Sequence, residues 1–299
     1  MRRPGIFATI LATFAACALA PHGAWAAAPM CGIASRAPAR YNHVVWFIFE
    51  NRAPRQIIGL PRKAPFFNRL RQRCGVATRY AAIAHPSLPN YIALTSGATQ
   101  GIVGDGSPKG HTVGARSVFD VVGSWRSYVE SMPHPCTLHD AYPYAVRHNP
   151  AAYYARLRPT LCARDLPLGT TTQGALAGDL ATNRLPRFSL VVPDFCHDTH
   201  NCSVTVGDRW LRSWVQKIVA SPVYRSRRTA IFVTFDENDG RAGNRVPLLV
   251  IAPTVRHRAT VTRRLSHYAL LRTTEELLGL RPLLGHAATA RSLRSLFHL

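Results

Sequence analysis

The sequence is poor in acidic residues, because its 299 residues include only 15 Asp and Glu against 37 Lys and Arg, a formal charge of 37 − 15 = +22. Lysine is scarce as well: Lys63, Lys109 and Lys217 are the only three, so arginine carries nearly all of the charge. Such a field attracts anionic surfaces such as phospholipid head groups, nucleic acids or wall polymers, although a genome rich in arginine codons would give the same composition. No five basic residues are consecutive, so we predict no specific nucleic-acid partner.

No apolar run reaches the about 20 residues that a membrane-spanning helix needs. The N-terminus instead has Arg2 and Arg3, an uncharged apolar stretch over residues 6–20, and the small-residue sequence Ala24-Trp25-Ala26. This order is typical of a cleavable export signal. We therefore predict a signal peptide over residues 1–26 and a secreted or periplasmic domain over residues 27–299, which is 299 − 26 = 273 residues. Lipid attachment at Cys17 is the alternative, because the preceding residues loosely match a lipobox.

No Cys-x-x-Cys pair is present, which disfavours zinc binding by cysteine. Six cysteines follow the predicted cleavage site: Cys31, Cys74, Cys136, Cys162, Cys196 and Cys202. An even number in an exported chain predicts up to three disulfides. The spacing leaves the pairing open, although Cys196 and Cys202 are close enough to close a short loop.

Internal repeats and low-complexity linkers are absent as well. Continuously apolar runs over residues 44–49, 188–192, 230–235 and 246–251 are typical of strands buried on both faces. Helical patterns lie between them, most clearly over residues 208–220 and 268–278. This order predicts an α/β fold with a mostly parallel central sheet flanked by helices. The aperiodic stretch over residues 104–182 is interpreted as insertions over one rim of that sheet.

The few acidic residues are unevenly placed, since seven of the 15 lie in three short segments: Glu50, Asp194, Asp198, Asp208, Asp236, Glu237 and Asp239. Several of them directly follow a predicted strand, where open α/β sheets bind their ligands. Clustered carboxylates in so basic a chain favour a cation site. The alternative is that they cap helices and pair with arginines, which would suit Asp208 better than the pair Asp236-Glu237.

Ser87 lies directly before a predicted helix, in the segment His85-Pro86-Ser87-Leu88-Pro89-Asn90-Tyr91. A serine in this place is often only a helix cap. A helix N-terminus also stabilises an anion, and a serine coordinated by a divalent metal can attack phosphorus. Both interpretations remain open on spacing alone.

Residues 85–91 resemble the nucleophile motif of the bacterial phosphoesterase family, which includes phospholipases C and acid phosphatases, and are similar to a motif of nucleotide pyrophosphatases in the wider alkaline phosphatase superfamily. Further stretches resemble the family in the same order: Val44 to Gly59, Ser124 to Pro133, Leu185 to Leu211, Thr234 to Asn238 and Ser266 to Tyr268, with Leu270 to Leu280 as the last helix. The segment His148-Asn149-Pro150 also resembles a family segment, although it could be a plain turn. The resemblance implies an alkaline-phosphatase-like core.

The resemblance implies that Ser87 is the nucleophile and a metal ligand, and that Asn90 donates to a phosphate oxygen. The oxygen-rich residues Glu50, Asn51, Ser87, Asp236 and Glu237 would suit Ca²⁺, Mg²⁺ or Mn²⁺. A second, more zinc-like site would use Asp198, His200 and His267, with His197 and Asp194 as competitors of His200. Two-metal relatives have Asp-His where this chain has Asp236-Glu237, which favours one metal ion over two.

We therefore expect an exported, metal-dependent hydrolase of phosphate esters that is similar to acid phosphatases and forms a phosphoserine. Its substrate would be a small phosphate ester or a phospholipid. A phospholipase C that acts on head groups is the first alternative. A catalytically decayed basic protein that binds anionic polymers is the second, and the presence of every proposed ligand argues against it. The sequence holds no signal for an oligomeric state.

Overall fold

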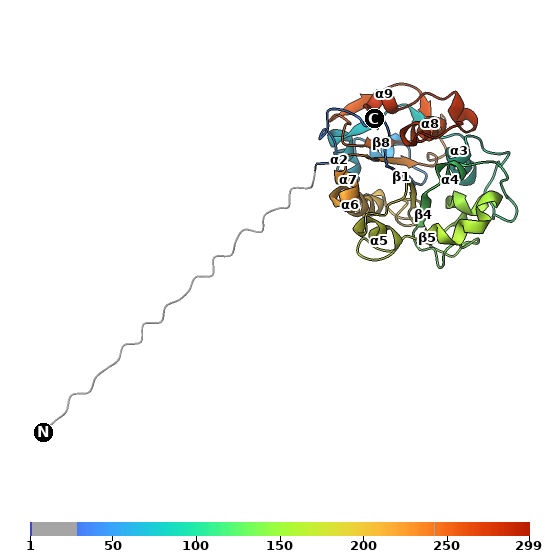
Figure 1. Cartoon of the computed structure of the whole chain (residues 1–299), viewed down its shortest axis with the longest axis horizontal. Helices are drawn as coiled ribbons and strands as arrows, with labels where there is room; N and C mark the ends of the chain where they lie inside the picture. Colours follow the sequence, from blue (N-terminus) through green and yellow to red (C-terminus); the bar gives the residue numbers. More distant parts are fainter. Residues whose placement is uncertain (2–28, 242) are drawn as a thin grey trace.

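The computed structural model describes residue 1, residues 29–241 and residues 243–299 (Figure 1). The predicted signal peptide therefore lies outside the described residues, except for Met1. Within these ranges, every helix is too short or too polar to span a bilayer. The buried apolar side chains of the described residues form one hydrophobic core.

The core is organised around an eight-stranded sheet with the strand order β5-β4-β6-β1-β7-β8-β2-β9. In chain order its strands are β1 His43–Phe49, β2 Gly75–Ala77, β4 Trp125–Val129, β5 Asp165–Pro167, β6 Phe188–Val192, β7 Thr229–Phe235, β8 Leu248–Ile251 and β9 Ala259–Val261. All neighbouring pairs are parallel except those that β8 makes with β7 and β2. The predicted α/β fold with a mostly parallel sheet is thus confirmed.

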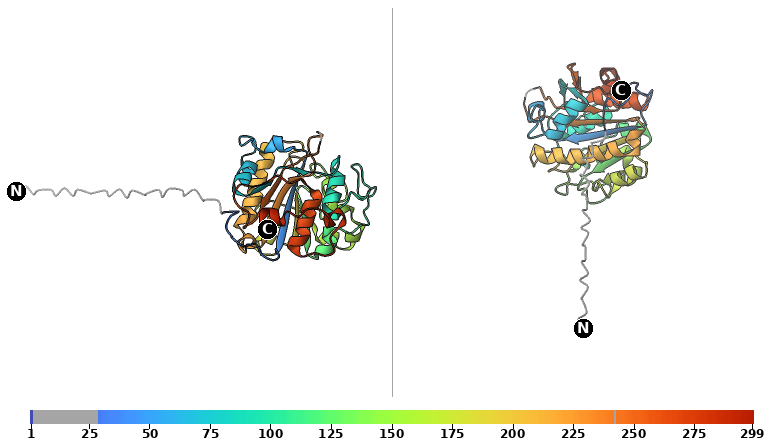
Figure 2. Two further views of the ribbon diagram at one scale, coloured as in Figure 1. Left: turned by 90° about the horizontal axis from the view of Figure 1, so that it is seen from above. Right: turned by 90° about the vertical axis from the view of Figure 1, so that its left-hand side faces the viewer.

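Helices cover both faces of this sheet, as Figure 2 shows for α6 on one side of the strands and α8 on the other. The α-helices are α1 Pro54–Ile57, α2 Pro65–Arg73, α3 Ser87–Ser96, α4 Val118–Val122, α5 Ala175–Ala181, α6 Val204–Ala220, α7 Pro222–Arg225, α8 His267–Leu278 and α9 Arg294–Phe297. Short 3-10 helices are η1 Val146–His148, η2 Pro150–Tyr153, η3 Ala155–Ala163 and η4 Gly285–Ala288. Helix α2 packs on α6, and α3 and α4 pack on α8. Burial on both faces explains why the central strands are apolar throughout.

The stretch over residues 104–182 is more than an insertion over the rim. It contributes β4 and β5 to the main sheet, where β4 pairs in parallel with β6. These strands are short, and β4 mixes Arg126 and Ser127 with apolar residues, so its sequence lacks the continuous apolar run of the central strands. The rim interpretation was therefore wrong for these two segments.

A second, two-stranded parallel sheet joins β3 Tyr80–Ala81 to β10 Leu265–Ser266. The chain leaves β3 toward Ser87 at the start of α3, and it leaves β10 directly into α8. Helix α3 is buried along its whole length and ends at Gly97, whose φ is +81°. A Cβ at Gly97 would lie 2.4 Å from the Leu284 carbonyl oxygen, so only glycine fits there.

Asp208 caps a helix, as one interpretation of the sequence expected, but the helix is α2 and not the one that contains Asp208. Helix α6 begins at Val204, so Asp208 lies in its second turn and does not open it. Its carboxylate instead accepts hydrogen bonds from the backbone N–H groups of Phe66 and Phe67, at 2.8–3.0 Å. Asp208 thereby caps the N-terminus of α2, where a negative charge is stabilising.

Three disulfides are formed: Cys31–Cys74, Cys136–Cys162 and Cys196–Cys202. The predicted use of all six cysteines and the short Cys196–Cys202 loop are both confirmed. This loop follows β6 and contains Asp198 and His200, so it is anchored beside the carboxyl ends of the central strands.

Candidate active site

Carboxylates meet where the central parallel strands end. Phe49 of β1 lies opposite Phe235 of β7, so the next residues, Glu50 and Asp236, become neighbours. The backbone N–H of Asp236 donates to the Phe49 carbonyl oxygen (2.9 Å), and the Glu50 N–H donates to the carbonyl oxygen of Asp198 (2.9 Å). Three buried carboxylates, those of Glu50, Asp198 and Asp236, are thus brought together by backbone pairing.

Ser87 points its hydroxyl at this group of carboxylates from the first position of α3. Its Oγ donates to Oε2 of Glu50 (3.0 Å), and the hydroxyl of Tyr91, one turn later on α3, donates to Oε1. Pro86 takes the N-cap position of α3, and Ser87 is the first residue of the helix. The interpretation of Ser87 as a plain helix cap therefore has no support, and the serine instead faces the polar cluster.

His148, which ends η1, completes the cluster. Its Nε2 lies 3.5 Å from Oε2 of Glu50 and its Nδ1 lies 3.5 Å from Oδ2 of Asp198. The ring stacks on Tyr91, with centroids 5.5 Å apart. Complete burial lowers the pKa of His148 to about 3, so the imidazole is neutral and can act as a ligand. In the sequence, His148 stands out only as part of a segment that resembles the family.

The electrostatics of the cluster are unfavourable without a cation. Burial, followed by the charges of Asp236 and Asp198, raises the pKa of Glu50 well above its usual range. Burial likewise raises the pKa of Asp198 to about 8 and that of Asp236 above its ordinary value. Carboxylates that repel one another in a dry site are costly unless they are protonated or bound to a metal ion.

Several polar atoms around the cluster are buried without a hydrogen-bond partner among the described residues. They are Oδ1 of Asn51, Nε2 of His148, Oδ2 of Asp198 and Oδ2 of Asp236. Buried polar atoms rarely remain without partners in proteins. Carboxylate, amide and imidazole donors suit a divalent cation, and ligand atoms of Glu50, His148 and Asp198 lie within 4.8 Å of one another. The residues present therefore fit a metal ion.

Two predicted histidine ligands are placed differently from these groups. His200 is exposed, and its Nδ1 bonds to Oδ1 of Asn201 (2.7 Å), while its backbone N–H donates to Oδ1 of Asp198 (2.7 Å). His267 is buried with both nitrogens engaged: Nε2 donates to the Asp236 carbonyl oxygen (2.6 Å), and Nδ1 accepts from the Tyr80 hydroxyl (2.9 Å). In this arrangement, His200 and His267 orient the backbone and side chains of the cluster.

Asn90 is also fully engaged. Its Oδ1 accepts from the N–H groups of Ile83 and Ala84, and its Nδ2 donates to the carbonyl oxygens of Ala84 and Pro86. This geometry leaves no free donor for a phosphate oxygen and makes Asn90 a brace for the segment that precedes Ser87.

Glu237 lies at the edge of the cluster and not in its centre. Its Oε2 lies 2.9 Å from Nδ1 of His85 and 3.3 Å from Nδ2 of Asn90. Burial and the neighbouring Asp236 raise the pKa of Glu237 to about 9. Glu237 therefore contributes to the crowding of acidic groups around Ser87.

A cation lies near the N-terminus of α3, beside Ser87. Oδ1 of Asp105 accepts from the N–H of Leu88 (3.0 Å) at the N-terminus of α3, and Nε of Arg147 lies 3.4 Å from the other oxygen of Asp105. The Arg147 guanidinium also covers the Phe195 ring at 4.9 Å. Sequence analysis did not identify this pair, although Arg147 directly precedes the noted segment that begins at His148.

A second group of titratable side chains lies nearby but is internally satisfied. Nδ1 of His197 lies 3.0 Å from Glu130 and 3.5 Å from Asp194, and Nε1 of Trp210 donates to the remaining oxygen of Glu130. Hydrogen bonding to Asp194 and then to Glu130 raises the pKa of His197 to about 10. A protonated His197 makes this group an ion-pair network that supports the Cys196–Cys202 loop.

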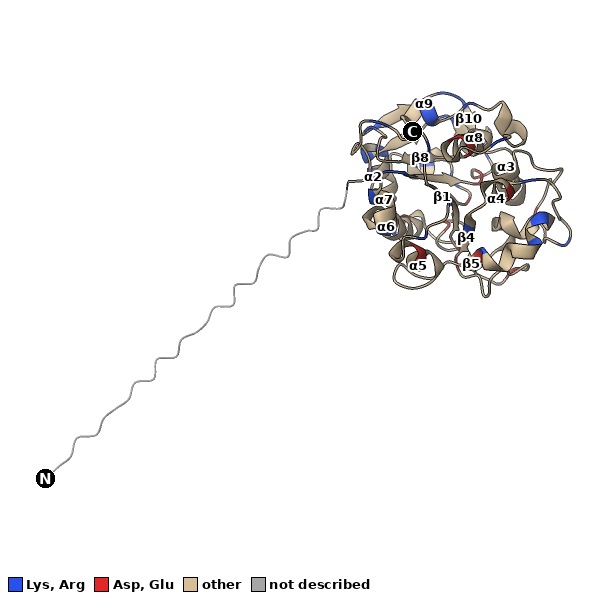
Figure 3. Cartoon of the chain, in the orientation of Figure 1, with Lys and Arg blue, Asp and Glu red and all other residues tan. Residues whose placement is uncertain are grey.

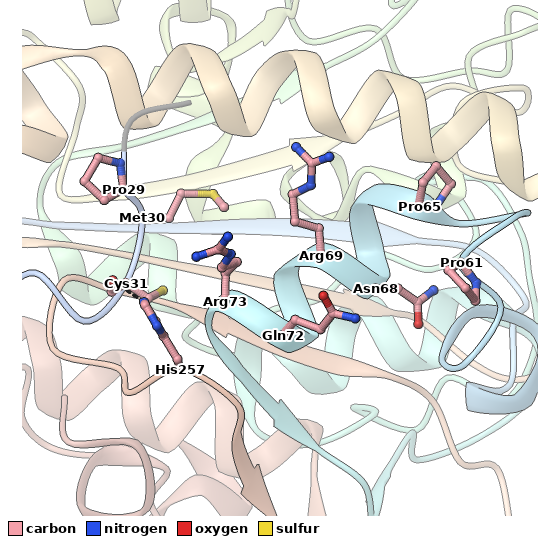
Figure 4. A pocket seen from close by; sticks show the side chains of 10 residues that line it. All are labelled: Pro29, Met30, Cys31, Pro61, Pro65, Asn68, Arg69, Gln72, Arg73 and His257. Atoms are coloured by element: carbon pink, nitrogen blue, oxygen red, sulfur yellow. Dashed lines mark hydrogen bonds between the residues drawn. The ribbon is translucent and has the colours of Figure 1, made fainter. Parts of the chain in front are cut away.

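A separate pocket of about 680 Å³ lies along α2 (Figure 4). Its lining includes Met30, Arg69, Gln72 and His257, and none of the cluster residues around Ser87. His257 there faces the carbonyl oxygen of Cys31 (3.1 Å), which fixes the N-terminal segment on the body of the protein. The chemistry of the buried carboxylates is therefore separate from this pocket.

The chain is similar to known proteins over most of its length. A model of the Phosphoesterase family matches residues 57–281, a range that contains Ser87, His148, Asp198 and Asp236. The phosphatidylinositol-3-phosphatase of Mycobacterium tuberculosis is 31% identical over 268 residues, which cover 88% of this chain and 85% of that protein. An acid phosphatase of Aspergillus fumigatus is 28% identical over 174 residues, which cover 54% of this chain and 38% of that enzyme.

The fold is also shared with solved structures. A protein of the alkaline phosphatase superfamily from Vibrio parahaemolyticus has a TM-score of 0.57 at 16% identity, over 90% of this chain and 74% of that chain. A phosphonate monoester hydrolase from Silicibacter pomeroyi has a TM-score of 0.53 at 11% identity, over 86% of this chain and 76% of that chain. These similarities confirm the expected alkaline-phosphatase-like core.

Proposed function

Because this chain belongs to the Phosphoesterase family and hydrolyses phosphoric esters, we propose that it is an acid-phosphatase-like enzyme in which Ser87 is the nucleophile. The observation that carries the proposal is the hydrogen bond from the Ser87 hydroxyl to Oε2 of Glu50, made at the N-terminus of a buried helix. A hydroxyl in that position has both an acceptor for its proton and a favourable field for negative charge.

In the proposed reaction, Oγ of Ser87 forms a bond to phosphorus while its proton passes to Oε2 of Glu50. The ester bond between phosphorus and the leaving oxygen breaks, and the leaving oxygen takes a proton from solvent. Water then attacks phosphorus and gives one proton to solvent, and the bond between phosphorus and Oγ of Ser87 breaks. Oε2 of Glu50 returns its proton to Oγ, which restores the hydroxyl as phosphate leaves. Arg147 lies beside the α3 N-terminus and would pair with phosphate oxygens in place of Asp105.

We propose that a divalent metal ion is held by Glu50, Asp198, Asp236 and His148, with Asn51 nearby. When bound, such an ion neutralises the crowded carboxylates and stabilises negative charge on the phosphoryl group. The unpartnered atoms of these side chains support this assignment, and Asn90 and His267 are assigned to positioning.

The substrate is proposed to be a phosphate monoester. The phosphatidylinositol-3-phosphatase and acid phosphatase names of the relatives support this choice over a phospholipase C activity. We also propose export through residues 1–26, which the three disulfides support. N-terminal sequencing of the mature protein would test the export proposal, and an uncleaved N-terminus would contradict it.

The test of the nucleophile is Ser87→Ala, with Ser213→Ala as a control on the exposed side of α6. Release of p-nitrophenol from its phosphate monoester should fall about 10³-fold or more in Ser87→Ala, as expected for loss of a covalent step at about 1.4 kcal/mol per tenfold, and should be unchanged in Ser213→Ala. A folded Ser87→Ala protein that keeps more than about a tenth of the turnover would contradict the assignment. Faster release from p-nitrophenyl phosphocholine than from the monoester would favour the phospholipase C alternative.

A further inference from the structure

A hollow of about 540 Å³ lies beside β3 and β10 and is lined mainly by arginine. Its lining residues, which we call the arginine cleft, are Arg79, Thr262, Arg263, Arg264 and Arg291. They come from three separate segments of the chain, so the fold and not a local run of basic sequence brings them together. Figure 3 shows how few acidic residues the ribbon carries beside the many basic ones.

The four arginines of the cleft have no counterion within the part of the chain that the structure describes. Among the described residues, none of them takes part in an ion pair or a side-chain hydrogen bond, and no carboxylate lines the hollow. A guanidinium cannot lose its charge at physiological pH, so the four groups repel one another across the hollow. An anion placed between them would interact favourably with all four.

One other basic hollow differs in this respect. A hollow of about 650 Å³ at the start of β1 contains Arg40, Arg187 and Arg228. There the Arg187 guanidinium donates to the carbonyl oxygens of Val122 and Leu278, so it is already committed to holding the fold. The guanidinium groups of the arginine cleft have no such structural task.

The cleft is separated from the catalytic cluster by the short β3–β10 sheet. Arg79 directly precedes β3, and Arg264 directly precedes β10. The two strands run in parallel, and the chain continues from their other ends toward Ser87 and His267. The cleft thus lies at the beginning of the strands whose ends lead to the catalytic cluster, and both are built on the same paired backbone.

We propose that the arginine cleft binds clustered phosphate groups at a site separate from the catalytic cluster. The planar guanidinium fork of arginine donates two hydrogen bonds to a phosphate, and the oxygens of one phosphate can be shared by several guanidinium groups. The Thr262 hydroxyl supplies one more donor. The phosphates could belong to a lipid surface or to a soluble polyphosphate. The inference uses no assumption about the nucleophile, so it can fail or hold independently of the proposed function.

The test compares two double variants with the same net charge. Arg263→Gln/Arg264→Gln changes the cleft, and Arg158→Gln/Arg184→Gln removes two exposed arginines elsewhere that make no ion pair among the described residues. Tripolyphosphate is titrated into each protein by calorimetry, with chelator present to prevent metal-dependent hydrolysis. We expect the cleft variant to bind at least about tenfold more weakly than the control, because each lost contact is a charge-assisted hydrogen bond. Thermal melting verifies that both variants are folded.

A second arm identifies the source of the phosphates. Co-sedimentation with phosphatidylcholine vesicles that contain phosphatidylinositol phosphate is measured for the unchanged protein and for the two double variants. Loss of sedimentation in the cleft variant alone assigns the site to a lipid surface, whereas a tripolyphosphate effect without vesicle binding assigns it to a soluble ligand. Equal weakening in the two variants, or no binding of either probe by the unchanged protein, would overturn the proposal.

Discussion

Replacing Asp198 with Asn should raise the stability of the metal-free protein. In the presence of metal, the variant should gain less stability from the ion than the unchanged protein does. The amide keeps the shape of the carboxyl group and can still accept the hydrogen bond that the His200 N–H donates to Oδ1. It removes one of three buried carboxyl groups, whose ionisation in the folded protein burial opposes. The sign of the effect on stability therefore depends on whether a metal ion is present.

The magnitude follows from the pKa of Asp198, which burial raises from 3.8 to about 8. A carboxyl group with a raised pKa in the folded state imposes no penalty below pH 3.8, and the penalty grows as the pH rises to 8. At pH 7 the solution is about three pH units above the ordinary pKa of the carboxyl group. At about 1.4 kcal/mol per unit, the buried group then lowers the free energy of unfolding by about 4 kcal/mol if the surrounding structure does not relax. For a domain of this size that is a rise in melting temperature of up to about 10 °C.

The assay is thermal unfolding in chelator from pH 4 to pH 8. Asp198→Asn should melt close to the unchanged protein at pH 4 and several degrees higher at pH 7. Addition of Mg²⁺, Ca²⁺, Mn²⁺ or Zn²⁺ should then stabilise the unchanged protein, by about 3 kcal/mol at a hundredfold excess over the dissociation constant, and the variant less.

The matched control is Asp165→Asn, which removes another buried carboxyl group. Burial raises the pKa of Asp165 to about 7, and within residues 29–241 and 243–299 its carboxylate accepts a hydrogen bond only from Asn149 (2.8 Å). This variant should gain stability at pH 7 in chelator and keep the full response to metal. A lower melting temperature of Asp198→Asn in chelator at pH 7, or equal metal responses of the two variants, would refute the reasoning.

Three further predictions concern single interactions. Tyr91→Phe removes the hydroxyl that donates to Oε1 of Glu50. Turnover should fall about tenfold, as for loss of one hydrogen bond to a charged group, and the acidic limb of the pH–rate profile should move. A profile that does not change would contradict this role of Tyr91. The double change Cys196→Ser/Cys202→Ser should lower the free energy of unfolding by only about 2 kcal/mol, whereas turnover should fall strongly. A variant that loses much stability but keeps its turnover would count against the loop as a support of the site. His197→Gln should destabilise the protein at pH 6 and have no effect near pH 10. The pKa of His197 is raised to about 10, so pairing of the protonated ring stabilises the fold fully below pH 6.5, and this stabilisation is lost as the pH rises to 10. A difference in melting temperature that is constant across this range would be inconsistent with the charge pair.

The central strands and the first two carboxylates were predictable from the sequence for a simple physical reason. Strands buried on both faces must be apolar throughout, as residues 44–49 and 230–235 are, and any polar residue that follows has reached the edge of the sheet. Glu50 and Asp236 directly follow these runs. Parallel pairing in register then makes them neighbours, which the sequence implies without any knowledge of loops.

The rest of the cluster depends on features that have no periodic signal. His148 ends a 3-10 helix in an irregular region, and only tertiary packing brings it 3.5 Å from Glu50. His200 and Asp198 are two residues apart, so spacing could not tell that the backbone of His200 binds Asp198 while its ring turns to solvent. His267 looked like a free ligand because its partner on Nε2 is a backbone carbonyl group, which a sequence does not reveal.

The order of the strands in the sheet also determines when the protein becomes active during folding. Glu50, His148, Asp198 and Asp236 span 236 − 50 = 186 positions of the chain, and β1 must pair with both β6 and β7 before the acidic groups meet. Contacts between such distant segments form slowly, because long loops have to close first. We therefore expect hydrolysis to return after denaturation only when the middle of the sheet has been assembled.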